Sequence, residues 1–356
     1  FFLEHMETSL LDESGFTKSF PVGDTEGIKR FFDEHGFVVV QNVLDKQESF
    51  KTIEEIGEQI ETFSKELKRV DMETWTPWQR ITNWLWESPL TSQHNDVTAE
   101  GGTYWPFSKN GIFADIARGE QMFCNRQKET VFSSFATVIG TEELLVSIDR
   151  FSVIQATTEE SQAWLHWDIN PWFATGVETR RQSSKGYKDI MLQRWKQENS
   201  AAKLFLTENN NTNTVEPMPV QGLIALSDNK HGEGGFMCVP GFHKKIQEWA
   251  QTNKKTTDVN HVKVSQIDHD DIEAFTEDKI VKVAVRQGDL LIWSACLPHC
   301  NYSGNKQRMC QYIKMFPSSI YDDDIRQARL EAVKQIFPPR FCPAPVGLRV
   351  FGYPQE

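Results

Sequence analysis

Apolar residues recur at helical spacing in three stretches of the first 140 positions. These stretches are residues 25–36, 46–68 and 117–139. We expect Thr25 to cap the first helix and Gly36 to end it. The apolar run "FVVVQNVL" that follows reads as a buried strand. Residues 71–110 are irregular and rich in Trp, Pro and Gly.

After Gly140 the pattern changes to short strands separated by turns. The predicted strands are residues 144–156, 163–169, 219–228, 235–241, 280–285, 289–295 and 308–316. Many strands after a helical region favour a β-sandwich or barrel with helices packed on one face. A polar, basic insert (173–214) interrupts the strands, and a last helix (322–337) follows them. We therefore expect an α+β protein with a mainly β core, in one domain spanning residues 1–356.

This organisation assigns residues 1–140 to a mostly helical part and residues 141–316 to the β core. Residues 317–356 form the C-terminal helix and tail. The 356 residues contain 39% hydrophobic and 12% aromatic residues, which is enough for a sizeable core.

The formal net charge of −12 argues against nucleic acid or an anionic membrane as the main partner. No apolar run approaches the length that spans a bilayer. The six cysteines are scattered, without paired spacing, which favours reduced thiols in the cytoplasm or an organelle lumen. The N-terminal residues lack the features of a secretory signal, so we do not expect secretion. We expect a monomer or weak dimer.

The stretch "AWLHWDINPW" places His166 and Asp168 two positions apart. On a strand such residues share one face, and Trp167 points to the other. This spacing alone is a weak signal, because it occurs by chance in many chains. His299 follows the predicted strand "QGDLLIW", and Arg308 comes nine residues later. Two histidines and one carboxylate form the facial triad that holds ferrous iron.

A 2-oxo acid bound to such an iron needs a cation for its distal carboxylate. Arginine suits this role, because its planar fork makes two hydrogen bonds and stays charged. Zinc is the nearest alternative metal, since Cys296, His299 and Cys300 are close in sequence, but a second pair of ligands is not evident.

With these residues, two further segments resemble the phytanoyl-CoA dioxygenase family of Fe(II)/2-oxoglutarate-dependent oxygenases. "FFDEHGFVVVQNVL" (31–44) is similar to the N-terminal element of the family, and "LIALSDNKHGEGGFMCVPGFHK" (223–244) to its central hairpin. Two positions depart from the family pattern. Phe242 stands where a small polar residue is usual, and Leu223 where several members carry Trp.

The resemblance implies a double-stranded β-helix of the jelly-roll or cupin-like type. It implies His166, Asp168 and His299 as iron ligands and Arg308 as the anchor of 2-oxoglutarate. Fe(II) would be the cofactor, and 2-oxoglutarate and O2 the co-substrates, converted to succinate and CO2. Family members that halogenate lack the carboxylate ligand, so Asp168 argues against a halogenase.

Several other residues are candidates for the site. Gln155 could face the metal from the preceding strand. Trp164, Trp172 and Trp293 lie close in sequence to the ligands, although a core role is more common for large aromatics. Arg180 and Arg181 begin a basic cluster in the insert. This cluster is either a solvated face or a lid that receives an anionic substrate.

We therefore expect an enzyme that oxidises a C–H bond of a small molecule by hydroxylation, oxidative cyclisation or desaturation. Two alternatives stay open. One is a hydroxylase that acts on a protein, and the other is a non-catalytic binding module on the same scaffold. The complete set of three ligands and Arg308 favours the enzyme.

Overall fold

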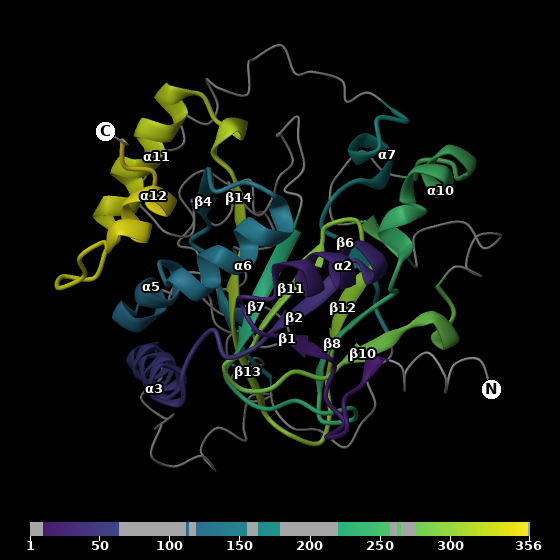
Figure 1. Cartoon of the computed structure of the whole chain (residues 1–356), viewed down its shortest axis with the longest axis horizontal. Coiled ribbons are helices and arrows are strands. Elements are labelled where there is room, and N and C mark those ends of the chain that lie inside the picture. The colour runs from purple at the N-terminus through teal and green to yellow at the C-terminus, as the bar shows by residue number, and fades with distance from the viewer. Residues whose placement is uncertain are drawn as a thin grey trace, which may run out of the picture.

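A computed structural model describes residues 10–63, 112–113, 119–154, 163–178, 220–256, 262–264 and 275–354. Their strands form two larger sheets and a two-stranded ribbon (Figure 1). The seven-stranded sheet has the order β1 (Ser19–Phe20), β2 (Phe37–Val40), β11 (Leu290–Ser294), β7 (Val220–Ala225), β13 (Arg308–Ile313), β5 (Phe151–Ile154) and β3 (Ile112–Phe113). The five-stranded sheet has the order β10 (Val281–Val283), β8 (Gly235–Cys238), β12 (His299–Tyr302), β6 (His166–Trp167) and β9 (Val262–Lys263).

The ribbon pairs β14 (Met315–Pro317) with β4 (Leu144–Val146). Apart from the parallel pair β1–β2, the pairs in the three sheets are antiparallel. The two larger sheets pack against each other, as the rings of Trp293 on β11 and Phe236 on β8 show, with centroids 4.6 Å apart. The structure is thus mixed, with helices around stacked antiparallel sheets, as the strand pattern predicted. The double-stranded β-helix stays a prediction.

Helices α2 (Thr25–His35), α3 (Lys46–Phe63), α5 (Glu120–Arg126) and α6 (Glu129–Ile139) belong to the seven-stranded side. Helix α6 approaches the sheet at Gly222, where an added Cβ would lie 2.8 Å from the Phe135 ring. The absent side chain therefore lets the helix pack closely against β7.

The outer face of the five-stranded sheet is also covered, so the expectation of helices on one face was incomplete. Helix α10 (Ile246–Thr252) places Trp249 against Trp167, with ring centroids 5.2 Å apart. Phe242 and Phe275 join the same cluster. Because strand side chains alternate, Trp167 needs apolar cover on the face opposite His166. Phe242 supplies part of this cover, which explains a large apolar residue in the hairpin.

Helix α2 ends as predicted at Gly36, which adopts the left-handed conformation with φ of 78°. Its N-cap, however, is Asp24 rather than Thr25, because the Asp24 carboxylate accepts the Gly27 N–H at 2.9 Å. The predicted 117–139 helix is instead two helices, with Lys128 in an extended conformation between them. Lys128 there forms an ion pair with Glu48 of α3.

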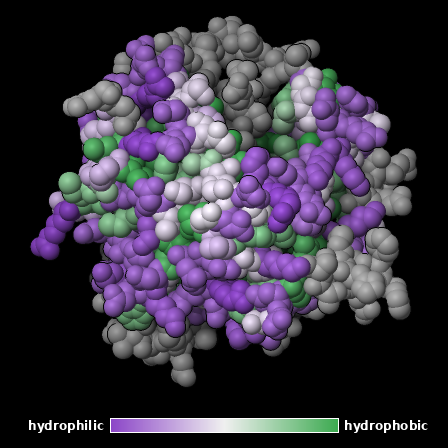
Figure 2. All heavy atoms as spheres, in the orientation of Figure 1, coloured by the Kyte–Doolittle hydropathy of each residue, from purple (hydrophilic) through white to green (hydrophobic). Residues whose placement is uncertain are grey.

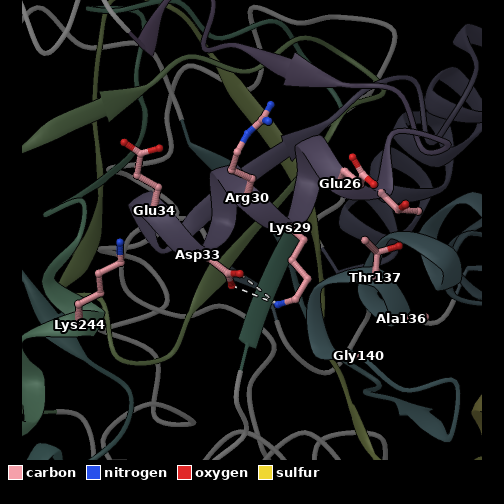
Figure 3. Close-up of a pocket in the computed structure, with 10 residues that line it drawn as sticks. Glu26, Lys29, Arg30, Asp33, Glu34, Ala136, Thr137, Gly140 and Lys244 are labelled. Atoms are coloured by element: carbon pink, nitrogen blue, oxygen red, sulfur yellow. Dashed lines mark hydrogen bonds and ion pairs between the residues drawn. The ribbon is translucent and has the colours of Figure 1, made fainter.

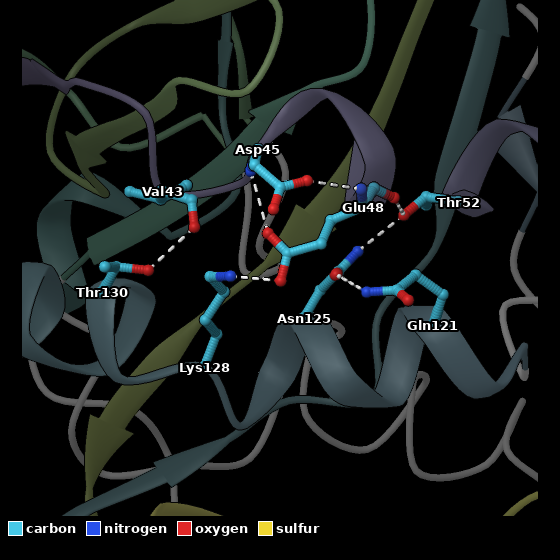
Figure 4. A network of polar contacts seen from close by, with 8 residues as sticks. All are labelled: Val43, Asp45, Glu48, Thr52, Gln121, Asn125, Lys128 and Thr130. Carbon is cyan, nitrogen blue, oxygen red and sulfur yellow. Dashed lines mark hydrogen bonds and ion pairs between the residues drawn. The ribbon is translucent and has the colours of Figure 1, made fainter. Parts of the chain in front are cut away.

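A polar network fixes α5 against α3 (Figure 4). The buried amide of Asn125 donates to the hydroxyl of Thr52 at 2.9 Å and to Gln311 of β13 at 2.8 Å. Glu55 accepts from the backbone N–H groups of Gln121 and Met122, so a carboxylate from α3 caps α5. These contacts couple the helical layer to the strand that carries Arg308.

The C-terminal helix α11 (Asp323–Gln335) lies within the predicted segment 322–337, and Asp322 is its N-cap. A further helix, α12 (Pro345–Phe351), was not predicted, and both lie on the opposite side of the molecule from α7 (Pro171–Ala174) and α10 (Figure 1). Helices in the described part lack the length and apolar character that crossing a membrane requires. The face in Figure 2 is mostly hydrophilic, with small hydrophobic patches.

Candidate metal centre

The three predicted ligands converge on one point between β6 and β12. His166 pairs directly with His299, so the two imidazoles project on the same face. Nε2 of His166 lies 3.5 Å from Asp168 Oδ1, and Nε2 of His299 lies 3.8 Å from Asp168 Oδ2. One ligand atom from each residue lies within 4.8 Å of the others. Two imidazole nitrogens and a carboxylate oxygen at this spacing could hold one metal ion.

Backbone carbonyls fix the orientation of both imidazoles. Nδ1 of His299 lies 2.9 Å from the Leu297 oxygen, and Nδ1 of His166 lies 3.4 Å from the Trp164 oxygen. Since a carbonyl can only accept, Nδ1 must carry the proton in these contacts. This tautomer leaves the Nε2 lone pairs directed toward Asp168, as a metal ligand requires.

The electrostatics keep His299 neutral. Burial, and after it the neighbouring His166, lower the pKa of His299 to about 3, although Asp168 opposes this shift. A neutral imidazole is the form that binds a metal, so a cation at this point need not displace a proton from His299 at neutral pH.

Aromatic rings enclose the two imidazoles. Trp164 stacks on His166 with the ring planes 5° apart, and Phe236 stacks on His299 at 5.5 Å. Trp293 approaches His299 from the other sheet, with centroids 5.4 Å apart. The structure therefore places two of the tryptophan candidates, Trp164 and Trp293, beside the ligands.

The local structure differs from the predicted strands. Strand β6 contains only His166 and Trp167, so Asp168 lies in a bend rather than on the strand. The chain turns here because Asn170 caps α7, accepting from the Trp172 and Phe173 N–H groups. His299 follows β11, as predicted, but it also begins β12, a strand that the sequence reasoning missed.

Arg308 begins β13 and is 2% exposed. Its Nη1 donates to Asn301 Oδ1 at 2.6 Å and to the Gly235 carbonyl at 3.3 Å. Asn301 in turn donates to the Tyr312 hydroxyl at 3.0 Å. Asn301 lies two residues after His299 on β12, so the arginine and the metal ligands are linked through one strand.

Asn301 begins the glycosylation motif "NYS" and was not among the candidate site residues. The alternation of side chains along a strand could have identified it as a neighbour of the site. Both ends of its amide group are engaged in these hydrogen bonds, which argues against a glycan there.

Trp172 is placed away from the ligands. It is 1% exposed, and its indole N–H donates to the Asn253 carbonyl at 2.7 Å. Its ring packs on Trp249, which favours the core role. Gln155, Arg180 and Arg181 lie outside the described residues.

The metal-ligand cluster found among the described residues contains no cysteine. Cys296 and Cys300, which suggested zinc, are free thiols whose pKa values burial raises. A raised pKa disfavours the thiolate that binds zinc.

A separate surface cleft of about 890 Å³ lies between α2 and α6 (Figure 3). Its lining mixes acidic and basic side chains, and Lys29 and Asp33 pair across one helical turn at 3.2 Å. None of the predicted ligands lines this cleft, so we assign it no chemistry.

The phytanoyl-CoA dioxygenase (PhyH) family model matches residues 182–307. The match includes the central hairpin and His299, begins after Asp168 and ends one residue before Arg308. A protein of Dictyostelium discoideum named "Putative phytanoyl-CoA dioxygenase" is 27% identical over 92% of this chain and 90% of its own length. These findings confirm the resemblance that the sequence motifs indicated.

Two other proteins match at lower sequence identity. An Aspergillus versicolor protein named "Ava biosynthesis cluster protein O" is 20% identical over 80% of this chain and 76% of its own length. The crystal structure of the non-heme alpha-ketoglutarate-dependent carbocyclase SnoK from nogalamycin biosynthesis covers 85% of this chain and 88% of its own chain. That comparison has 12% identity and a TM-score of 0.46, so we draw no conclusion about the reaction from it.

Proposed function

We propose that this chain, whose resemblance to the phytanoyl-CoA dioxygenase family is established, is a non-haem Fe(II)/2-oxoglutarate-dependent dioxygenase acting on a small molecule. The observation that carries the proposal is the convergence of His166, Asp168 and His299 on one point. The hydrogen bond from Arg308 to Asn301, which lies on the same strand as His299, also supports the proposal.

His166, Asp168 and His299 would hold the iron through their Nε2 atoms and one carboxylate oxygen. Three protein ligands on one side leave the remaining positions free for the co-substrates. When bound, iron would supply the activation of O2, coupled to conversion of 2-oxoglutarate to succinate and CO2, that oxidises a C–H bond. The Leu297 and Trp164 carbonyls keep both imidazoles in the ligand tautomer.

Arg308 would bind the distal carboxylate of 2-oxoglutarate. Its charge is buried, and Asn301 and the Gly235 carbonyl engage one side of the guanidinium. An arginine held in this way is preorganised for a planar carboxylate, and a buried cation gains from an anionic partner.

We also propose that the two packed sheets form a double-stranded β-helix with the metal centre between them. The contacts of Trp293 with Phe236 and His299 support this arrangement, because they join the two sheets at the ligands. In this arrangement the enclosing rings Trp164, Phe236 and Trp293 exclude water from the ligands.

A small molecule of specialised metabolism is the substrate class that we favour, supported by the relative named for a biosynthesis cluster. Hydroxylation is the default outcome, and oxidative cyclisation or desaturation are the alternatives. A protein hydroxylase and a binding module are the competing functions.

The decisive experiment is anaerobic. Fe(II) and then 2-oxoglutarate are added to the purified apoprotein, and the weak visible charge-transfer band of the chelate is recorded. We expect a band that needs both additions and is lost in Arg308→Leu. Absence of the band in the wild-type chain, with tight zinc binding instead, would favour the binding module.

A further inference from the structure

Trp293 carries a buried hydrogen-bond donor that lacks an acceptor in the described structure. The side chain is 2% exposed, and its indole Nε1 has no hydrogen-bond partner. Its ring packs between Phe236 and His299. An unsatisfied buried N–H costs folding free energy, and such groups often have a functional explanation. This donor lies beside a proposed iron ligand.

The register of the seven-stranded sheet places two further polar side chains in a row with Trp293. Trp293 on β11 pairs directly with Gln221 on β7, which is 3% exposed. On the other side of β7, the antiparallel strand β13 pairs Ile313 with Gly222. The next residue along the chain, Lys314, therefore lies opposite Gln221. Directly paired residues project on the same face of a sheet. The row therefore contains an indole N–H, a carboxamide and an ammonium group.

Lys314 is a buried cation in this row, with a relative exposure of 5%. Its backbone is fixed between the strands, because its N–H donates to the Ser147 hydroxyl at 3.0 Å and its carbonyl accepts the Ser147 N–H at 2.9 Å. The strand register places its side chain on the face that carries Trp293 and Gln221. An ammonium group on this face can make a charge-assisted hydrogen bond to a carboxylate.

The row is distinct from the position proposed for the co-substrate. Arg308 begins β13 and Lys314 directly follows its last residue, so the two are six residues apart, about 20 Å along an extended chain. This segment thus presents two cations, and the proposed 2-oxoglutarate site uses only Arg308. Arg150 adds charge near Tyr312, with its guanidinium 5.2 Å from the ring, although Asp149 pairs with it at 3.7 Å.

We propose that Trp293, Gln221 and Lys314 bind a carboxylate group of the substrate. Lys314 neutralises the carboxylate charge, and the indole N–H of Trp293 donates to one of its oxygens. The substrate is therefore an organic acid, held with its acid group near His299. This inference rests on the proposed function, which it deepens by naming the substrate class.

The test uses the full chain loaded with Zn(II) and saturated with 2-oxoglutarate, so that Arg308 is occupied. Benzoate and benzamide are the probes, because they have the same shape but differ in charge. The readout is the indole ¹H–¹⁵N resonance of Trp293, identified by its loss in Trp293→Phe and by its broadening when Co(II) replaces Zn(II). We expect benzoate to move this resonance downfield to saturation and benzamide to leave it in place.

Variants of Lys314 test the charge. We expect Lys314→Met to weaken benzoate binding at least tenfold and Lys314→Arg to keep it within about threefold. Lys282→Met, on β10 of the other sheet, is the matched control and should bind benzoate as the wild type does. A Lys314→Met variant with wild-type benzoate affinity would remove Lys314 from the subsite.

The outcomes separate this inference from the proposed function. If the Fe(II)/2-oxoglutarate band forms but benzoate and benzamide act alike on Trp293, the carboxylate subsite is overturned and the oxygenase stands. If 2-oxoglutarate alone moves the Trp293 resonance, the acceptor is the co-substrate, which also overturns the inference. If the band never forms, the proposed function itself fails. Comparison of the two probes in the wild-type chain does not depend on the folding of any variant.

Discussion

The indole ring of Trp164 lies parallel to the imidazole of His166, with centroids 4.7 Å apart and planes 5° apart. The Trp164 carbonyl also lies 3.4 Å from His166 Nδ1. One residue thus restrains this ligand through both its ring and its backbone. Only the ring contact can be removed by substitution, so its contribution can be measured separately.

We expect Trp164→Leu to weaken metal binding by about two- to tenfold, which corresponds to the roughly 0.5–1.5 kcal/mol of an aromatic pair. Competition calorimetry with Co(II) measures this affinity. Trp164→Phe, which keeps a ring, should lose less. If the leucine variant binds Co(II) like the wild type, the stack does not orient His166.

Removal of a ligand should have a larger effect. His166→Ala or Asp168→Ala is expected to weaken Co(II) binding by more than about 100-fold, since loss of supporting residues alone costs 10–100-fold at metal sites. Circular dichroism should show an intact fold, and turnover should be lost. His231→Ala is the control, because His231 is an exposed histidine outside the triad. Turnover in either ligand variant would exclude the assignment.

Arg308→Leu should weaken 2-oxoglutarate binding by at least about 30-fold, because removal of one partner of a buried charge pair costs 2–5 kcal/mol. Co(II) affinity should change little, since Arg308 is not a ligand. Both affinities are measured anaerobically by titration. Arg349→Leu, at the surface, is the control. An unchanged requirement for 2-oxoglutarate would remove Arg308 from this role.

Asp289 should make stability depend on pH. Burial raises the pKa of its carboxyl to about 6 from 3.8, although the Asn42 N–H, which donates at 2.8 Å, lowers it. Because the folded state holds this proton more tightly, the stabilisation is complete below pH 3.8 and is lost as the pH rises through 6. Asp289→Asn keeps the acceptor without the charge.

We therefore expect Asp289→Asn to be more stable than the wild type at pH 8, with a free energy of unfolding larger by about 1–3 kcal/mol. This difference should shrink toward pH 4. Urea unfolding at several pH values measures it. Asp323→Asn, at an exposed helix start, is the control. A difference that stays constant with pH contradicts the prediction.

Asn125 should contribute strongly to stability. Asn125→Ala removes the hydrogen bonds to Thr52 and Gln311 and leaves their buried polar groups unpaired. We expect the free energy of unfolding to fall by about 2–4 kcal/mol. Ser133→Ala, on the exposed side of the next helix, should change it by less than about 0.5 kcal/mol. Equal effects of the two substitutions would show that the network is unimportant.

The sequence by itself determined the elements whose signals are local. The helical spacing and Gly36 predicted the end of α2, and "DDDIRQARLEAVKQIF" predicted a helix where α11 lies. The types and order of His166, Asp168, His299 and Arg308 also sufficed to predict a metal site, because facial-triad chemistry restricts which residues can serve.

The tertiary structure decided what depends on contacts between distant segments. The break before α6 places Lys128 beside Glu48, and the start of β12 at His299 depends on pairing with His166. Neither the helix break nor the start of β12 has a strong signal in the local sequence. Strand ends are set by which partner supplies hydrogen bonds, and the sequence does not show the partner.

The same reason explains Asn301 and Trp293. Alternation shows which residues share a face, but only the register between strands shows what that face meets. Pairing across β11, β7 and β13 aligned Trp293 with Gln221 and Lys314, three residues that are distant in sequence. The sequence thus specified the chemistry of the ligands, whereas the register between strands, a property of the folded sheet, specified which side chains surround them.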